Sequence, residues 1–172
     1  MIRVLLGDPM AVEADALFRS VGADFEACTA LDERVGAGAG PAVLARLRAF
    51  GEVPVGSALV TPGGNLLFPF LIHLVLRSHE EPVSGERLRK ALRNGLRHAA
   101  EWELTRVVIP PLGTGAGNLD AEVAAGILCA VVREHTSSAE FPNELYFIAM
   151  NAYGEEALSR EVARVFPAPE VP

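Results

Sequence analysis

Short apolar runs alternate along the chain with longer stretches in which apolar residues recur every three to four positions. The short runs predict strands at residues 2–6, 15–20, 57–61, 70–76, 106–110 and 145–150. The longer stretches predict amphipathic helices at residues 42–50, 84–100, 121–134 and 153–165. Because the run 70–76 is apolar on both faces, we expect this strand inside a covered sheet. The pattern predicts an α/β fold: a three-layer α/β/α sandwich with a mixed, mainly parallel central sheet.

Length and composition suit one compact domain. The chain has 172 residues, half of them hydrophobic, and we expect one domain over residues 1–166 followed by a frayed, proline-rich tail at 167–172. No apolar run approaches the ~18 residues of a membrane span, and Met1 leads directly into a strand without a signal-peptide pattern. We therefore expect a soluble, cytoplasmic protein with no membrane partner.

Charge and cysteine usage exclude several function classes. The net charge of −7 argues against a surface that binds extended nucleic acid, although it does not exclude a single nucleotide. Cys28 and Cys129 are isolated, so we expect buried thiols, no disulfide and no metal site. We also expect no bound cofactor. The mean hydropathy of +0.26 fits either a well-buried core or a subunit interface, which leaves a homo-oligomer open.

A glycine-rich loop follows the strand at 106–110 and precedes the helix at 121–134. Residues 112–118 read Leu-Gly-Thr-Gly-Ala-Gly-Asn, so alternate glycines can take positive φ and turn backbone N–H groups toward a bound oxyanion. The loop lacks the Lys-Ser/Thr of a P-loop and the spacing of a dinucleotide fingerprint. The pattern predicts a phosphate cradle without lysine, and the alternative is a tight strand-to-helix turn.

Three segments, in the same order along the chain, resemble the macro domain family, an ADP-ribose-binding α/β/α module. The first is Gly7-Asp8 with the later run 13–17, the second is 55–77 with its Thr-Pro-Gly-Gly-Asn-Leu turn, and the third is 109–125. The resemblance spans nearly the whole chain. It implies that the protein binds ADP-ribose or a related adenine nucleotide diphosphate, and that ADP-ribosylated protein is a candidate partner.

The resemblance also implies roles for individual residues. Asp8 resembles the aspartate that accepts a hydrogen bond from the adenine amino group, and the alternative is a turn residue after the first strand. The loop that resembles the family's pyrophosphate and distal-ribose loop consists of Gly113, Thr114, Gly115, Ala116 and Gly117. The Thr114 hydroxyl is either a ligand donor or a loop-stabilising group.

Two further residues match family positions. Tyr153 follows the last strand, where it is a candidate for stacking on the base, and the alternative is a core or staple contact at the helix start. His73 matches a strand histidine that we interpret as structural, since a single histidine in an apolar strand is seldom a ligand or base.

The segment 19–28 departs from the family pattern. Macro domains that hydrolyse ADP-ribosyl bonds usually carry Asn-Ala-Ala-Asn and then a glycine run, whereas this chain reads Arg-Ser-Val-Gly-Ala-Asp-Phe-Glu-Ala-Cys. We interpret Arg19 as a solvated or ion-paired residue at a strand end, with a phosphate contact as the alternative. The later glycine cluster at 36–40 is interpreted as helix–turn structure.

Acidic residues in and after this segment are candidates for a general base: Asp24, Glu26, Asp32 and Glu33. Their spacing does not choose among them, and the alternative is that all four are solvated surface acids. We therefore predict a nucleotide-binding domain and leave turnover open, with weak hydrolysis at most. A hydrolase of ADP-ribosyl groups or ADP-ribose phosphate is the first alternative, and a degenerate domain acting as an interaction module is the second.

Overall fold

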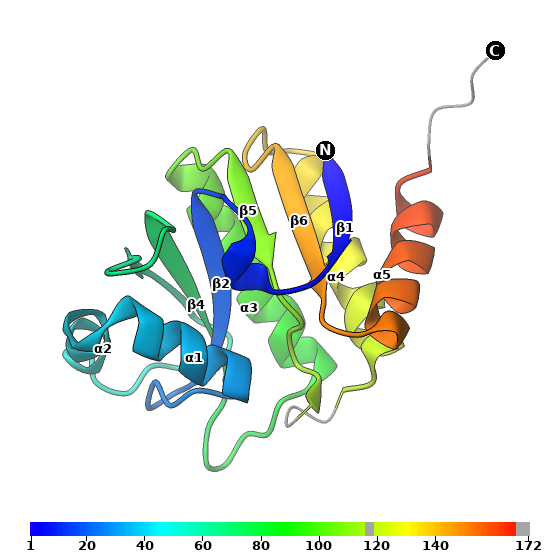
Figure 1. The fold of residues 1–172 in the computed structure, drawn as a ribbon. Helices are drawn as coiled ribbons and strands as arrows, with labels where there is room; N and C mark the ends of the chain where they lie inside the picture. Colours follow the sequence, from blue (N-terminus) through cyan, green and yellow to red (C-terminus); the bar gives the residue numbers. More distant parts are fainter. Residues whose placement is uncertain (116–118, 168–172) are drawn as a thin grey trace.

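The computed structural model describes residues 1–115 and 119–167. Its strands are β1 (Ile2–Leu6), β2 (Ala16–Gly22), β3 (Ala58–Pro62), β4 (Phe70–Arg77), β5 (Arg106–Ile109) and β6 (Glu144–Ala149). Its helices are the short 3₁₀ helix η1 (Pro9–Ala11), α1 (Ala30–Ala39), α2 (Pro41–Arg48), α3 (Gly85–Glu101), α4 (Ala121–Thr136) and α5 (Ala152–Val165). Figure 1 shows these elements in one sheet with helices packed around it. The end of the predicted tail lies outside the described residues, so its fraying stays a prediction.

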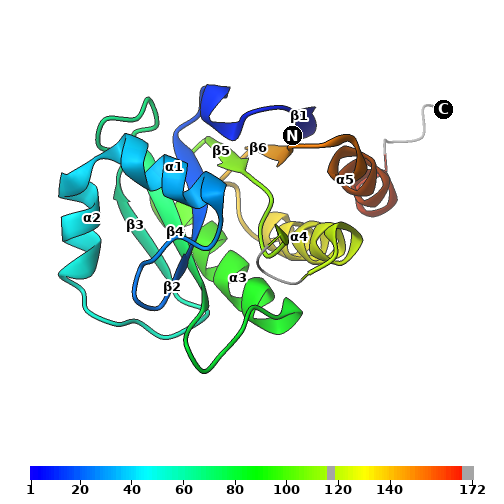
Figure 2. The same cartoon turned by 60° about the horizontal axis from the view of Figure 1, so that its bottom comes forward.

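The strands form a six-stranded sheet in the order β1-β6-β5-β2-β4-β3. All neighbouring pairs are parallel except β3 and β4, which form an antiparallel hairpin. Helices cover both faces: α1 and α2 lie on one side, and α3, α4 and α5 on the other (Figure 2). The predicted three-layer sandwich with a mixed, mainly parallel sheet is confirmed.

Alternation along the strands divides the core between the two faces. In β5, Val107 and Ile109 pack toward α3 and α4, whereas Val108 packs toward α1 and α2. Both faces of β4 are buried, as its apolar pattern predicts. Cys28 and Cys129 are free and buried. Burial raises the pKa of Cys28 to about 11 and that of Cys129 to about 12, so neither carries much thiolate at neutral pH.

The chain leaves neighbouring strands toward opposite faces at two places. The connection after β5 runs to α4 on one face, and the connection after the adjacent β2 runs to α1 on the other. The pair β6 and β1 behaves in the same way, since β6 leads to α5 and β1 leads to η1. Such divergence opens crevices beyond the carboxyl ends of parallel strands, which is where α/β sheets bind ligands.

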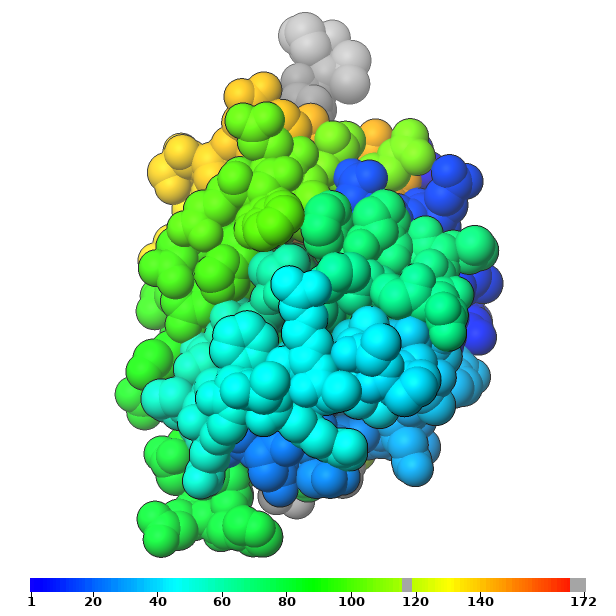
Figure 3. Space-filling model, turned by 90° about the vertical axis from the view of Figure 1, so that its left-hand side faces the viewer, coloured from blue at the N-terminus to red at the C-terminus, as the bar shows by residue number. Residues whose placement is uncertain are grey.

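Two local features differ from the sequence prediction. Strand β2 continues to Gly22 instead of ending near residue 20. Helix α1, which begins at Ala30, was not among the predicted helices, and the glycine cluster at 36–40, interpreted as helix–turn structure, forms its last turn and its C-cap. Seen from the β3 side, α2 and the segment after it (cyan) form much of the molecular surface (Figure 3). No helix in the described part of the chain is long and apolar enough to cross a membrane.

Candidate functional site

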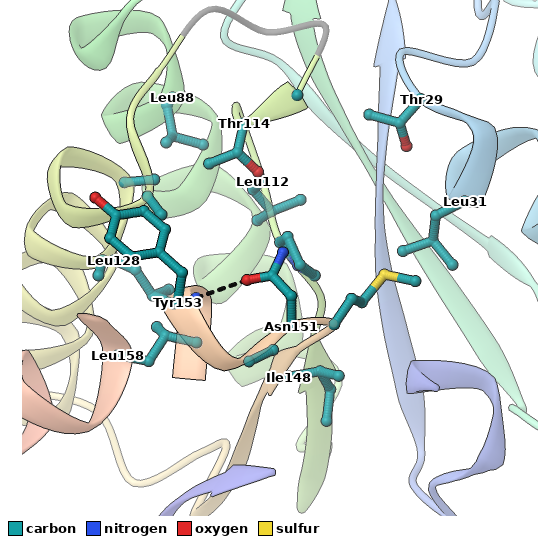
Figure 4. Close-up of a pocket in the computed structure, with 18 of the residues that line it drawn as sticks. Thr29, Leu31, Leu88, Leu112, Thr114, Leu128, Ile148, Asn151, Tyr153 and Leu158 are labelled. Carbon is teal, nitrogen blue, oxygen red and sulfur yellow. Dashed lines mark hydrogen bonds between the residues drawn. The ribbon is translucent and has the colours of Figure 1, made fainter. Parts of the chain in front are cut away.

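A cavity of about 400 Å³ lies at the carboxyl ends of β5 and β6. Its walls come from the start of α1, the loop after β5, the start of α5 and the sides of α3 and α4 (Figure 4). Polar side chains in the wall come from Thr29, Thr114, Asn151 and Tyr153, and the described lining contains no Asp, Glu, Lys or Arg. An anion in this cavity would have to be held by backbone N–H groups, hydroxyls and helix dipoles.

The loop after β5 forms one wall of the cavity. Gly113 and Gly115 have φ of 74° and 67°, the left-handed region that glycine adopts without strain. A Cβ at Gly113 would come within 2.9 Å of Leu119, so this position is closed, whereas a Cβ at Gly115 would meet no described atom within 4 Å. The Thr114 hydroxyl makes no hydrogen bond to any described residue. The other two predicted cradle residues, Ala116 and Gly117, lie outside the described residues.

Three helices begin at this cavity: α1, α4 and α5. The first N–H groups of a helix lack intrahelical acceptors and carry the positive end of its dipole. In α5, Asn151 Oδ1 accepts from Gly154 N at 2.8 Å, and the N–H groups of Ala152 and Tyr153 have no acceptor among the described residues. The capping carboxylates of Asp32 in α1 and Asp120 in α4 offset part of the positive potential.

Tyr153 lines the cavity with its ring half exposed. Its hydroxyl donates to Asp120 at 3.3 Å, which joins the start of α5 to the N-cap of α4. The predicted alternative was a core or staple contact, and with 53% of the residue exposed Tyr153 is not a buried core residue. Stacking on a base stays a prediction.

Asp8 lies in a neighbouring hollow of about 340 Å³ at the ends of β1 and β6. Met150 and Asn151 line both this hollow and the main cavity, so the two adjoin at the start of α5. Asp8 Oδ1 caps η1 by accepting from Met10 N at 3.0 Å, as the turn alternative predicts. The same oxygen accepts from Arg34 of α1 at 2.6 Å, a contact that the sequence analysis did not anticipate.

Arg19 is a buried residue, and its interpretation as a solvated group at a strand end is wrong. Because β2 continues beyond it, Arg19 sits inside the strand with 3% of its surface exposed. Its Nε donates to the backbone oxygen of Asp32 at 2.8 Å, and its Nη1 lies 3.4 Å from His73 Nδ1. A Cβ at Gly36 would overlap the guanidinium, so a side chain there would displace it.

His73 is fully buried, as expected for a structural histidine. Burial and the nearby Arg19 lower the pKa of His73 to about 3, so the ring is neutral at pH 7. Since a guanidinium only donates, Nδ1 is the acceptor, and Nε2 carries the hydrogen that it donates to Thr61 Oγ1 at 2.8 Å. The protonated Nε2 faces Thr61, and no solvent reaches the ring, so His73 serves no ligand.

Asp32 is also buried, and both the general-base and the surface-acid interpretations of it are wrong. Its Oδ1 accepts from Ser20 N at 2.9 Å. Its Oδ2 accepts from Ser20 Oγ, Thr29 N and Thr29 Oγ1 at 2.7, 3.1 and 2.7 Å. A carboxylate with four donors and 2% exposure cannot take a proton from a substrate. Its effect is to fix the start of α1 against the end of β2.

The remaining acids lie away from the main cavity. Asp24 and Glu26 line a separate polar hollow beside the ends of β2 and β4, together with Arg77 and His79. Glu33 is exposed on α1 and lines neither the cavity nor the hollow of Asp8. Within the described residues, none of the predicted bases reaches the cavity, and no cluster of His, Cys, Asp and Glu forms a metal site.

The site includes residues that the sequence analysis did not select. Asn151 and Thr29 both cap helices at the cavity, and Arg34 pairs with Asp8. The spacing Thr29-Ala-Leu-Asp32 is a capping-box signal that could have identified the start of α1. Arg34 had no sequence signal, because its partner lies 26 residues earlier.

The model of the Macro domain family matches residues 20–128. A macro domain-containing protein of Cupriavidus necator is 30% identical over 156 residues, which cover 87% of this chain and 90% of that protein. An O-acetyl-ADP-ribose deacetylase of Salmonella typhimurium is 27% identical over 161 residues, which cover 90% of this chain and 88% of the enzyme. Among solved structures, a mutant Oceanobacillus iheyensis macrodomain with ADPR superposes with a TM-score of 0.85 at 18% identity, covering 97% of this chain and 94% of that one.

Proposed function

Because the chain belongs to the macro domain family, we propose that it binds ADP-ribose or a related adenine nucleotide diphosphate at the carboxyl end of its sheet. The observation that carries the proposal is the convergence of the loop after β5, through Thr114 and Gly115, and of three helix starts on one cavity whose described lining has no acidic side chain. Such a site favours an anion even in a protein with a net charge of −7. The similar macrodomain that holds ADPR supports the choice of ligand.

In the proposed complex, the diphosphate lies against the N–H groups of Gly113, Thr114 and Gly115. The adenine lies in the adjoining hollow, where its amino group donates to Asp8. Leu6 and Met150 line this hollow and are large apolar side chains about half exposed, which supports a flat apolar occupant. Tyr153, which lines the main cavity and is half exposed, is available to stack on the ligand.

The same site would accept the ADP-ribosyl group of a modified protein, which we propose as a partner. All the groups invoked come from one chain, so binding requires no oligomer. The free cysteines suit a reducing compartment, and we propose that the protein acts in the cytoplasm.

Calorimetric titration with ADP-ribose, ADP and AMP tests the proposal. ADP-ribose and ADP are expected to bind, and AMP to bind about tenfold or more weakly, because it lacks the second phosphate that the loop would hold. Equal affinity for ADP and AMP would contradict the diphosphate cradle. No binding of any of the three would favour a degenerate interaction module.

Hydrolysis of ADP-ribosyl or O-acyl groups is the second candidate, and the similar deacetylase favours it. We expect turnover to be slow, since Asp32 is buried with four donors and the other candidate acids do not line the cavity. Misplacing a reacting group by ~1 Å can cost about a hundredfold in rate. The rate of ADP-ribose release from an ADP-ribosylated protein measures this turnover. Rapid release that Asp24→Ala or Glu26→Ala abolishes would establish an enzyme with a base in the segment 19–28.

A further inference from the structure

Only one of the two carboxylate oxygens of Asp8 accepts hydrogen bonds from described residues. Its two hydrogen bonds, from Met10 N and from Arg34 Nη2, both end on Oδ1. No described residue donates to Oδ2. Asp8 is exposed in a hollow that it shares with Arg34, Leu6 and Met150. A ligand in the hollow therefore meets one open acceptor.

The backbone after Asp8 offers no donor to accompany that acceptor. Pro9 has no N–H. The N–H of Met10 is held by Asp8 Oδ1, and the N–H of Ala11 donates to the Asp8 carbonyl at 3.1 Å. On the other side, Gly7 N donates to Ala149 O at 2.9 Å. Among the charged side chains that line the hollow, Arg34 can supply a donor beside Oδ2.

Arg34 is also the one cationic side chain in the described lining of the cavity and of the Asp8 hollow. Its guanidinium has five N–H groups, and the structure uses one of them, toward Asp8. The helix that carries it is held in place, because Asp32 fixes the start of α1 to Ser20 of β2. Arg34 thus projects from an anchored segment and keeps donors free beside the carboxylate.

We propose that Arg34 and Asp8 together read the base of the bound nucleotide, with Asp8 Oδ2 accepting from an exocyclic amine and Arg34 donating to the ring nitrogen beside it. This rests on the proposed function and assigns a base-specifying role to Arg34. An acceptor next to a donor is the arrangement by which an amide side chain reads adenine. In adenine the amine is flanked by N1 and N7, both acceptors, so either edge presents the donor–acceptor pair that the two side chains match.

Titration of the wild type and of Arg34→Ala with ADP, 1-deaza-ADP and 7-deaza-ADP tests the proposal. Each analogue replaces one ring nitrogen by carbon and keeps the amine. The wild type is expected to bind one of the two analogues about tenfold more weakly than ADP, which is the effect of losing one hydrogen bond to a charged group. In Arg34→Ala, ADP itself should bind about tenfold more weakly, and that analogue should bind as well as ADP.

The control is Arg93→Ala, which removes an ion pair of similar exposure between α3 and α4. Arg93 lies 2.8 Å from Glu134 with a side chain 52% exposed, the same exposure as Arg34. This variant should keep the wild-type preference, and thermal unfolding should show both variants folded. If an analogue loses as much affinity relative to ADP in Arg34→Ala as in the wild type, or if neither analogue loses affinity in the wild type, the role of Arg34 is overturned and the proposed function is not. No binding of ADP by the wild type would overturn the proposed function as well.

Discussion

Replacing Asp32 with alanine is expected to lower the free energy of unfolding by about 3 kcal/mol or more. The carboxylate accepts hydrogen bonds from the N–H and hydroxyl groups of both Ser20 and Thr29, and the site is too buried for water to replace them. The change also removes the negative charge of Asp32 that compensates the positive charge of the buried Arg19. Burial lowers the pKa of Arg19, and Asp32 is the largest of the neighbouring charges that raise it. A buried cation that loses its counter-charge is costly.

Urea unfolding of Asp32→Ala and of a matched Asp24→Ala variant measures the effect. Asp24 is exposed and caps only the N–H of Glu26, so its replacement should cost about 1 kcal/mol or less. For a domain of this size, the Asp32 variant should melt roughly 6–12 °C below the wild type. If the two variants unfold alike, the buried cluster does not hold α1 in place.

Replacing Gly115 with valine is expected to weaken ADP-ribose binding by ~2 kcal/mol, about thirtyfold. A Cβ at Gly115 would meet no described atom, so the new side chain would enter the space that we propose for the diphosphate. A positive φ of 67° strains valine, so some loss of stability is expected as well. Calorimetry and thermal unfolding separate the two effects.

Gly51→Val is the matched control for this strain. Gly51 follows α2 with φ of 71°, lines neither the cavity nor the Asp8 hollow, and has no described atom within 4 Å of an added Cβ. The two variants should lose similar stability, and only Gly115→Val should lose affinity. Wild-type affinity in a folded Gly115→Val protein would mean that the loop is only a turn.

Local patterns predicted most of the fold because its elements bury regular apolar faces. The strands at 2–6 and 70–76 and the helix after Ser84 lie where periodicity puts them, and Ser84 is the N-cap of α3. The segment 19–28 was read wrongly for a tertiary reason. Arg19 is acceptable inside β2 only because His73 and the Asp32 carbonyl, brought by β4 and α1, receive its N–H groups.

The parts of the candidate site that short stretches of sequence mark could be predicted. The glycines after β5 and the N-cap at the start of α5 adjoin strand ends, and the sheet brings strand ends together. Asp8 was selected from its neighbours along the chain, and the structure does give it the turn contact of the alternative reading. Arg34 could not be predicted, since nothing local marks one arginine on a helix as the partner of a loop carboxylate.

The most direct test of the central claim is an amide NMR titration of the isotope-labelled protein with ADP-ribose. Leu31 lies in the first turn of α1 and lines the cavity. If the nucleotide rests on the loop and the helix starts, the signals of Gly113, Gly115 and Leu31 will move and saturate together, while that of Gly51 stays in place. If ADP-ribose at millimolar concentration leaves the signals of Gly113 and Gly115 unchanged, this cavity does not hold the diphosphate and the account is wrong.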